Sequence, residues 1–161
     1  MIMKKKTLLK KIRYRRKHWD STVEAIVKKG LEKERISDKW FVKDSIAHIT
    51  WYEKELLDAL EKKSIVESEF WNMSVKDRNE MIFNKTQEKS FDEILEDSRS
   101  TFDALLVKIE SLSNEELCSD VYIRRKSDTR VTWDFIGGIT FWHYEDHEDL
   151  FIELFDLDYG L

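Results

Sequence analysis

Two histidines near the end of the chain, His143 and His147, carry the clearest chemical signal in the sequence. They are four residues apart, and residues at that spacing on a helix have Cβ atoms roughly 5–6 Å apart. Two imidazoles so placed can reach one metal ion. Both histidines lie on an apolar stripe whose steps of three, four and seven residues predict one face of a helix. The stripe consists of Trp133, Ile136, Thr140, His143, His147, Leu150 or Phe151, and Leu154.

A third histidine, His48, is expected in the middle of another helix, on or beside its buried face. Metal sites are regularly built in bundle cores from side chains on facing helices. Three neutral imidazoles with an open position suit a catalytic Zn²⁺, and imidazole also binds Ni and Fe. The sequence therefore predicts a divalent-metal site, for Zn, Ni or Fe, at His48, His143 and His147.

The alternative is that these histidines are polar core residues, satisfied by backbone groups or water. An uncompensated polar group facing the interior costs free energy, which favours the metal site. The fourth histidine, His18, lies in a run of basic residues and is expected at the surface. The acids around the late pair are expected on other faces of the helix, in solvent: Glu145, Asp146, Glu148 and Asp149.

Several side chains are candidates for contact with a substrate. Tyr52 follows His48 by four residues, so it is expected on the same helix face, where it could donate a proton or a hydrogen bond to substrate. Asp44 precedes His48 by four residues and could orient its ring, or simply stabilise the first helical turn. Plain core packing is the alternative for Tyr52 and for the candidate pocket walls. Those walls are Trp51, Trp71, Trp142 and Tyr144, and they suit a small, partly apolar substrate.

The elements that must position these residues are helical. The chain of 161 residues has no proline and only four glycines, whereas strand-rich folds need frequent turns that draw on both. Stripes at helical spacing predict long helices over residues 5–28, 42–62, 91–111 and 132–155, with shorter ones near 74–85 and 113–116. Thr132 is the expected cap of the last long helix. Residues 118–131 are polar, and either a surface loop or a small hairpin fits them.

Four long helices with one long connection between the second and third predict an all-α four-helix bundle with a crossover. The length predicts a single domain spanning residues 1–161. The lone Cys118 leaves no partner for a disulfide within the chain, which fits a reducing, cytoplasmic setting. No run approaches the roughly 18 apolar residues of a membrane-spanning helix, so no membrane association is expected.

The net charge of −5 conceals an uneven distribution. The first thirty residues hold eleven Lys and Arg against two acids, whereas residues 132–161 hold eight acids and no Lys or Arg. The basic start could bind nucleic acid or a membrane surface, or it could be a targeting peptide. We favour a third explanation, in which the first and last helices are neighbours whose charges offset each other. Nucleic-acid binding is therefore not expected.

Two motifs in the chain resemble a known superfamily. Residues 40–44 (WFVKD) and 47–53 (AHITWYE) resemble the W-S-V-K-D-x-x-A-H-L-T-x-W-E signature of the DinB/YfiT-like helical bundle superfamily. Residues 71–80, 90–95 and 112–117 resemble its ClbS/DfsB branch, and HYEDH at 143–147 is similar to that branch's H-Y-x-E-H region. Phe41 departs from the pattern, because the family usually has Ser as the helix cap there.

The resemblance implies a bundle with up-down-down-up connectivity and a cavity near one end. It also implies a three-histidine metal site, which falls at His48, His143 and His147. The superfamily includes metal-dependent S-transferases that use bacterial low-molecular-weight thiols, and isomerases related to them. The ClbS/DfsB branch is linked to protection from DNA-damaging small molecules, and some of its members lack the histidines. Related bundles pair, so a homodimer is expected.

Two classes of function follow from this resemblance. The first is a metal-dependent enzyme that acts on small electrophilic molecules by thiol transfer or hydrolysis, in detoxification or stress protection. Its partners would be a small-molecule substrate and a low-molecular-weight thiol. The second is a metal-free protein that sequesters a toxic small molecule without catalysis.

Overall fold

The computed structural model describes residues 3–123 and 130–158, which form eight helices and no β-strand. The predicted all-helical class is confirmed. The helices are α1 (Lys5–Lys28), α2 (Val42–Lys62), α3 (Glu69–Asn72), α4 (Val75–Thr86), α5 (Phe91–Ser111), α6 (Asn114–Cys118), α7 (Thr132–Ile139) and α8 (Phe141–Phe155).

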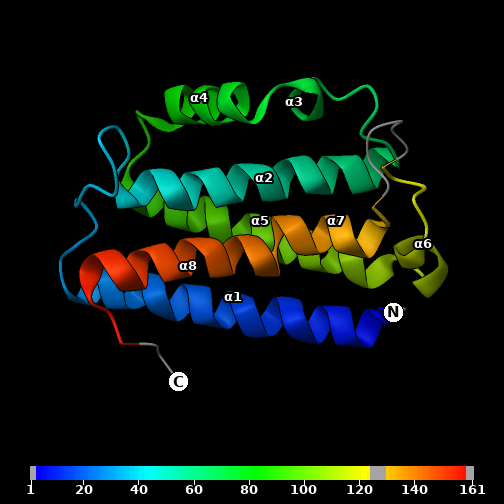
Figure 1. Ribbon diagram of the computed structural model, residues 1–161, viewed down its shortest axis with the longest axis horizontal. Helices are drawn as coiled ribbons and strands as arrows, with labels where there is room; N and C mark the ends of the chain where they lie inside the picture. The colour runs from blue at the N-terminus through cyan, green and yellow to red at the C-terminus, as the bar shows by residue number, and fades with distance from the viewer. Residues whose placement is uncertain (1–2, 124–129, 159–161) are drawn as a thin grey trace.

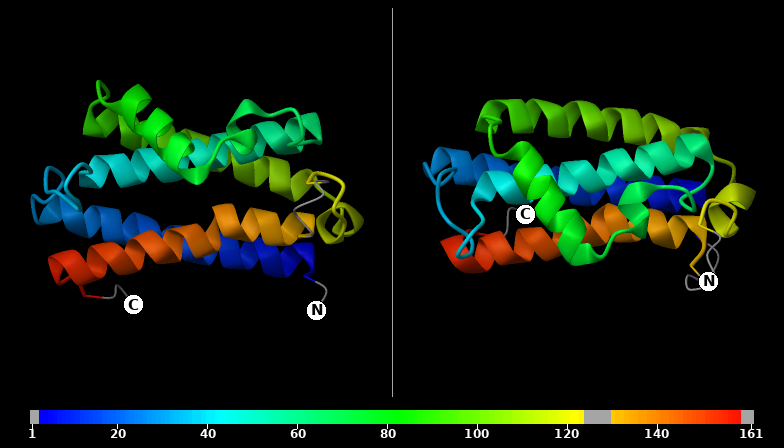
Figure 2. Two further views of the ribbon diagram at one scale, coloured as in Figure 1. Left: turned by 45° about the horizontal axis from the view of Figure 1, so that its top comes forward. Right: turned by 90° about the horizontal axis from the view of Figure 1, so that it is seen from above.

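The long helices lie side by side, with α2 packed mainly against α5 and α1 mainly against α8 (Figure 1). Along the chain, α1 and the α7–α8 pair run in one direction, and α2 and α5 run in the other. The connection between α2 and α5 contains α3 and α4. These two short helices lie over the outer side of α2, and α4 packs against it (Figure 2).

Local hydrogen bonds explain where two of these helices begin. Ser90 Oγ accepts from the Glu93 amide at 3.2 Å, and the Glu93 carboxylate accepts from the Ser90 amide at 2.7 Å. The two bonds form a reciprocal capping box, which starts α5 at the predicted residue. At the start of α2 the expected serine is replaced by Phe41, yet the Asp44 carboxylate accepts from the Phe41 amide at 2.8 Å. One half of a capping box therefore suffices to begin α2 at the predicted residue.

The last long segment differs from the prediction of one continuous helix. It breaks at Thr140, whose backbone angles (φ −111°, ψ −100°) fall outside the helical region. The break brings Phe141 back onto the preceding turn, where a Cβ on Gly137 would lie 2.6 Å from its ring. Only glycine leaves room for that ring, so the sequence of α7 permits the bend.

The region between α6 and α7 is partly described. Residues 124–129, within the stretch 118–131 predicted as a loop or small hairpin, lie outside the described residues. Thr132 was expected to cap the last helix, but Val131 is the capping residue and Thr132 begins α7. The Thr132 hydroxyl donates instead to the Ser119 carbonyl at 2.8 Å, which ties the start of α7 to the end of α6.

The core has two apolar halves with polar side chains between them. One half is built around Ile12, Leu56 and Leu105, and the other around Trp19 and Ile49. Between these positions, each contributing helix carries a buried polar residue. They are Arg16 on α1, Glu53 on α2, Ser98 on α5 and Tyr144 on α8. We call these four residues the arginine layer.

The basic α1 and the acidic α8 are neighbours, as the uneven charge predicted. An ion pair joins Arg15 to Glu145 across their seam. Lys29 also reaches the backbone carbonyl of Asp156 at 3.4 Å. None of the described helices is both long enough and apolar enough to cross a bilayer.

Candidate metal centre

The three predicted ligands converge. His48 of α2 faces His143 and His147 of α8, and the Nε2 atoms of His48 and His143 lie 2.9 Å apart. Each histidine offers one ring nitrogen, and these three atoms lie within 4.8 Å of one another. Metal–imidazole bonds of about 2.0–2.1 Å allow one ion to join nitrogens up to about 4 Å apart. The nitrogens of His48 and His143 already lie within this distance. The most widely separated nitrogens would come within it by a small rotation of their side chains.

The chemistry of the donors also fits a metal. Burial away from water, followed by the neighbouring imidazoles, lowers the pKa of His48 to about 2. Burial, followed by the neighbouring His147, lowers the pKa of His143 to about 3. The Ile139 backbone carbonyl acts in the opposite direction and raises this pKa. Burial alone lowers the pKa of His147 to about 4. All three rings are therefore neutral near pH 7, the state in which imidazole binds a metal.

The histidines leave polar atoms without partners. Among the described residues, no group hydrogen-bonds the buried Nδ1 atoms of His48 and His147. Buried polar atoms in folded proteins are nearly always paired, so each exception requires a reason. A partner that is not part of the chain, such as an ion or a water molecule, would supply these interactions. The three residues can hold a metal ion.

Tyr52 lies against the histidine cluster, as its spacing predicted. Its ring centroid is 4.8 Å from that of His48 and 5.4 Å from that of His143. Its hydroxyl donates to the Asn79 side chain at 3.4 Å. Burial raises the pKa of Tyr52, although the nearby Arg78 partly opposes this, so the phenol keeps its proton at neutral pH. It can act as a hydrogen-bond or proton donor beside the centre.

Only one of the four candidate pocket walls lies next to this tyrosine. Trp71 packs edge-on against Tyr52, with ring centroids 5.9 Å apart. Trp51 instead hydrogen-bonds Glu55 and lines a separate groove of about 730 Å³ between α2 and the α3–α4 connection. The remaining two walls, both on α8, lie away from the histidines.

Trp142 is 40% exposed and lines a shallow hollow with Lys11 and Tyr14, so it does not enclose the centre. Tyr144 is fully buried, and its hydroxyl donates to Glu53. Neither side chain shares the face of His143, because neighbouring residues on a helix point about 100° apart.

Of the two roles considered for Asp44, the structure supports stabilisation of the first turn of α2. Its oxygens accept from the Phe41 amide and from Gln87 at 3.1 Å, so the carboxylate does not orient His48. The expectation for Glu148 is corrected. Glu148 is not in solvent. It is buried in the α1–α8 seam and accepts from the Thr22 hydroxyl at 3.0 Å. His18 is partly exposed beside Tyr14 and stands apart from the other histidines, as expected.

The sequence analysis did not predict the arginine layer. The Arg16 guanidinium donates to Asp20 at 2.8 Å and to the Ser98 hydroxyl at 2.9 Å, and it lies 3.5 Å from Glu53. The spacing of the two charged residues could have indicated their burial. Arg16 and Glu53 occupy stripe positions, three or four residues from the apolar residues on either side. A charged residue in such a position predicts a buried, paired charge.

Comparison with protein families identifies the family to which the chain belongs. The sequence model of the DinB family matches residues 1–134. The chain belongs to the DinB family. Comparisons with curated proteins and with solved structures gave no significant match. In this DinB-family protein the matched range contains His48 and Tyr52 but ends before His143 and His147. The evidence for the two late histidines as ligands is therefore their convergence on His48 in space.

Proposed function

We propose that this DinB-family protein is a metal-dependent enzyme that acts on small electrophilic molecules by thiol transfer or hydrolysis. His48, His143 and His147 would hold the divalent metal, which would be Zn, Ni or Fe. The observation that carries the proposal is the convergence of three neutral imidazoles from two helices, with buried nitrogens left unpaired. A metal bound there would lower the pKa of a bound water or thiol and yield a nucleophile near neutral pH.

The surrounding residues support chemistry of this kind. Tyr52 keeps its proton and lies beside two of the histidines, so it can donate to a developing negative charge on substrate. Phe70 and Trp71 pack edge-on against Tyr52 and reduce its access to water. Arg78 donates to the backbone carbonyls of both aromatic residues, at 3.0 and 3.1 Å, and thereby positions them.

Finer parts of the proposal rest on resemblance. We assign the chain to the ClbS/DfsB branch, with a cytoplasmic role in detoxification or stress protection. We also assign it the four-helix bundle of that superfamily, in up-down-down-up order. The opposed directions of α1 and α8 relative to α2 and α5 support this arrangement. A low-molecular-weight thiol is the proposed co-substrate.

A metal-free binding protein is the second candidate. The observation that favours it is the 2.9 Å approach of the His48 and His143 Nε2 atoms, which allows one ring to donate to the other without any ion. Such a protein would sequester a small molecule through its aromatic side chains.

Metal titration separates the two candidates. Chelator-treated protein would be titrated with Zn²⁺ and Ni²⁺ by calorimetry, and its melting temperature measured at each step. A ligand that binds only the folded state raises that temperature. We expect one ion per chain and a rise that His147→Ala abolishes, whereas the matched His18→Ala variant keeps it. No binding by the wild type, or an equal rise in His147→Ala, would leave the metal-free candidate in its place.

A further inference from the structure

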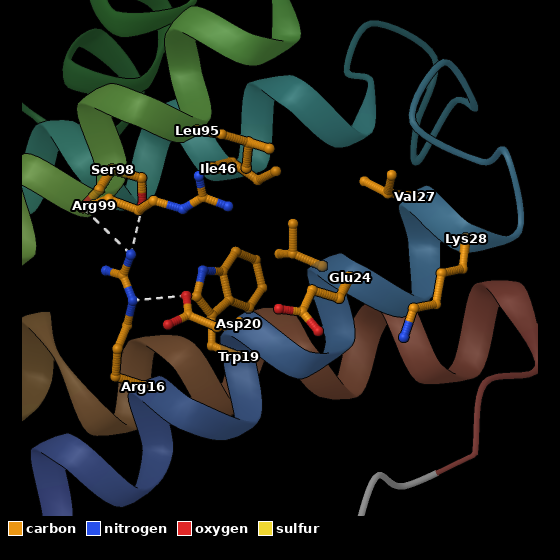
Figure 3. A pocket seen from close by; sticks show the side chains of 11 residues that line it. Arg16, Trp19, Asp20, Glu24, Val27, Lys28, Ile46, Leu95, Ser98 and Arg99 are labelled. Atoms are coloured by element: carbon orange, nitrogen blue, oxygen red, sulfur yellow. Dashed lines mark hydrogen bonds and ion pairs between the residues drawn. The ribbon is translucent and has the colours of Figure 1, made fainter.

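A second cavity lies between α1 and α5, with one wall from α2, apart from the histidine cluster (Figure 3). Its volume is about 290 Å³. An apolar cavity of about 150 Å³ can hold a benzene ring, so this one has room for a ligand of about two fused rings. None of the three histidines lines it.

The floor of this cavity is apolar and firmly held. Trp19, Val23 and Ile46 line it and are almost fully buried. The Trp19 ring is fixed from behind by stacking on Phe151, with centroids 5.4 Å apart. It also contacts His147 edge-on, at 6.5 Å between ring centroids. The floor is therefore rigid but presents little surface of its own, so a ligand ring would pack on the more exposed apolar lining residues Val27 and Leu95.

The charges around the cavity favour an anionic group. Arg16 is already engaged with Asp20, Glu53 and Ser98. The lining holds three basic side chains against two acidic ones. Arg99 forms no ion pair within the described part of the chain, although its charge, after that of Arg16, opposes the burial that raises the pKa of the nearby Asp20. Its side chain extends from α5 across the cavity (Figure 3).

We propose that the α1–α5 cavity binds a small aromatic anion. The ring of the ligand packs on Val27 and Leu95, above the buried Trp19, and its carboxylate, sulfonate or phosphate group pairs with the Arg99 guanidinium. The planar guanidinium, with its five N–H donors, is suited to such groups. This site is separate from the proposed metal centre and does not depend on it. Trp19 forms a wall of the cavity and contacts His147, so it joins the two regions.

The test uses 1-naphthalenesulfonate as the probe, with binding measured by calorimetry on the full chain and Trp fluorescence as a second readout. The neutral analogue 1-naphthalenemethanol reports how much of the affinity depends on the negative charge. We expect Arg99→Met to weaken sulfonate binding about tenfold, the usual effect of losing one charge-assisted hydrogen bond. Its effect on the neutral analogue should be small.

Three further variants locate the binding site. Val27 lines the cavity and is 45% exposed, so Val27→Trp should block entry without disturbing the core. Arg13→Met is the matched control, because Arg13 is an exposed arginine of α1 that pairs with Glu110 outside the cavity. His143→Ala should bind the probe as the wild type does, because the ring contacts of His143 are with His48, Tyr52 and His147 and not with the cavity lining. That result would hold even if the metal proposal failed.

Three results would each overturn this assignment. One is no binding of the sulfonate to the wild type at about 1 mM, which corresponds to a free energy weaker than about −4 kcal/mol. Another is wild-type affinity in both Arg99→Met and Val27→Trp, which would place the probe elsewhere. The third is loss of binding in His143→Ala, which would assign the probe to the histidine cluster.

Discussion

The histidine cluster and the arginine layer are both polar groups inside an apolar bundle, but they satisfy their polar atoms differently. In the arginine layer the protein supplies the partners, since Arg16, Glu53 and Tyr144 interact with one another and Ser98 completes the set. Only one Glu53 oxygen is left without a partner among the described residues. In the histidine cluster, the Nδ1 atoms of His48 and His147 have none.

This difference distinguishes the arginine layer, which has a structural role, from the histidine cluster, which is a candidate binding site. Removing charges from water is costly, and the arginine layer offsets that cost by pairing them within the fold. The histidines avoid the cost by remaining neutral, which leaves nitrogen lone pairs free for a partner from solution. A buried polar group that the protein does not satisfy itself is therefore the more informative sign of function. The comparison can be tested by perturbing each region separately.

The largest expected change in the free energy of unfolding comes from a substitution in the arginine layer. Arg16→Met leaves the fully buried Glu53 without its counter-ion, and breaking a buried pair in this way costs about 3 kcal/mol or more. His147→Leu in metal-free protein removes a neutral side chain and should change the unfolding free energy by less than about 1 kcal/mol. Urea unfolding at pH 8 with chelator measures both. Equal losses would contradict the distinction drawn between the two regions.

The next effect is the pH dependence caused by Glu53. Burial raises its pKa to about 7, from 4.5 in the unfolded chain, and the nearby Arg16 opposes this only in part. A raised carboxyl pKa contributes stability that is present below pH 4.5 and lost as the pH rises through 7. Wild-type stability should therefore decline relative to Glu53→Gln by about 2 kcal/mol between pH 5 and pH 8. Parallel curves would show that Glu53 stays ionised in the fold.

The histidine cluster should produce a slope of opposite sign. The folded-state pKa of His147 is about 4, below the ordinary value of 6.5, so its contribution is present above pH 6.5 and lost as the pH falls. In metal-free protein, wild-type stability should fall relative to His147→Leu by about 1–2 kcal/mol between pH 7.5 and pH 5. Urea unfolding at a series of pH values measures this. A wild-type curve parallel to that of His147→Leu would mean that the imidazole protonates freely in the folded state.

Much of this arrangement was predictable from the sequence, because it depends on local periodicity. The long helices α1, α2 and α5 begin and end where their stripes and caps indicated. Spacings of four residues fix that His48 and Tyr52 share one helix face and that His143 and His147 share another. That these two faces meet depends on the packing of α8 near α2. The neighbouring positions Trp142 and Tyr144 could have been rejected by the same rule, since adjacent residues on a helix point in different directions.

Other features depend on contacts between distant segments, which local patterns do not encode. The break at Thr140 follows from the packing of the Phe141 ring onto Gly137. In the sequence these residues read as part of one continuous stripe. Burial of Glu148 required knowledge that Thr22 of α1 would face it across the seam. The α1–α5 cavity likewise exists only because α1 packs mainly on α8, which leaves its side toward α5 partly open.

The smallest expected effect concerns ion pairs at the surface, a third environment with which both buried regions can be compared. Arg15 and Glu145 pair across the α1–α8 seam, where their side chains are 32% and 38% exposed. Pairs of this kind contribute about 0–1 kcal/mol, and salt screens them because the Debye length is only about 10 Å at 0.1 M. A double-mutant cycle with Arg15→Gln and Glu145→Gln should give a coupling of about 0.5 kcal/mol in low salt. The coupling should be close to zero in about 1 M NaCl, where the Debye length is about 3 Å. The more exposed Arg13–Glu110 pair, at 51% and 42%, provides the control and should couple less. A coupling for Arg15–Glu145 that persists in high salt would mean that this seam behaves as part of the buried arginine layer.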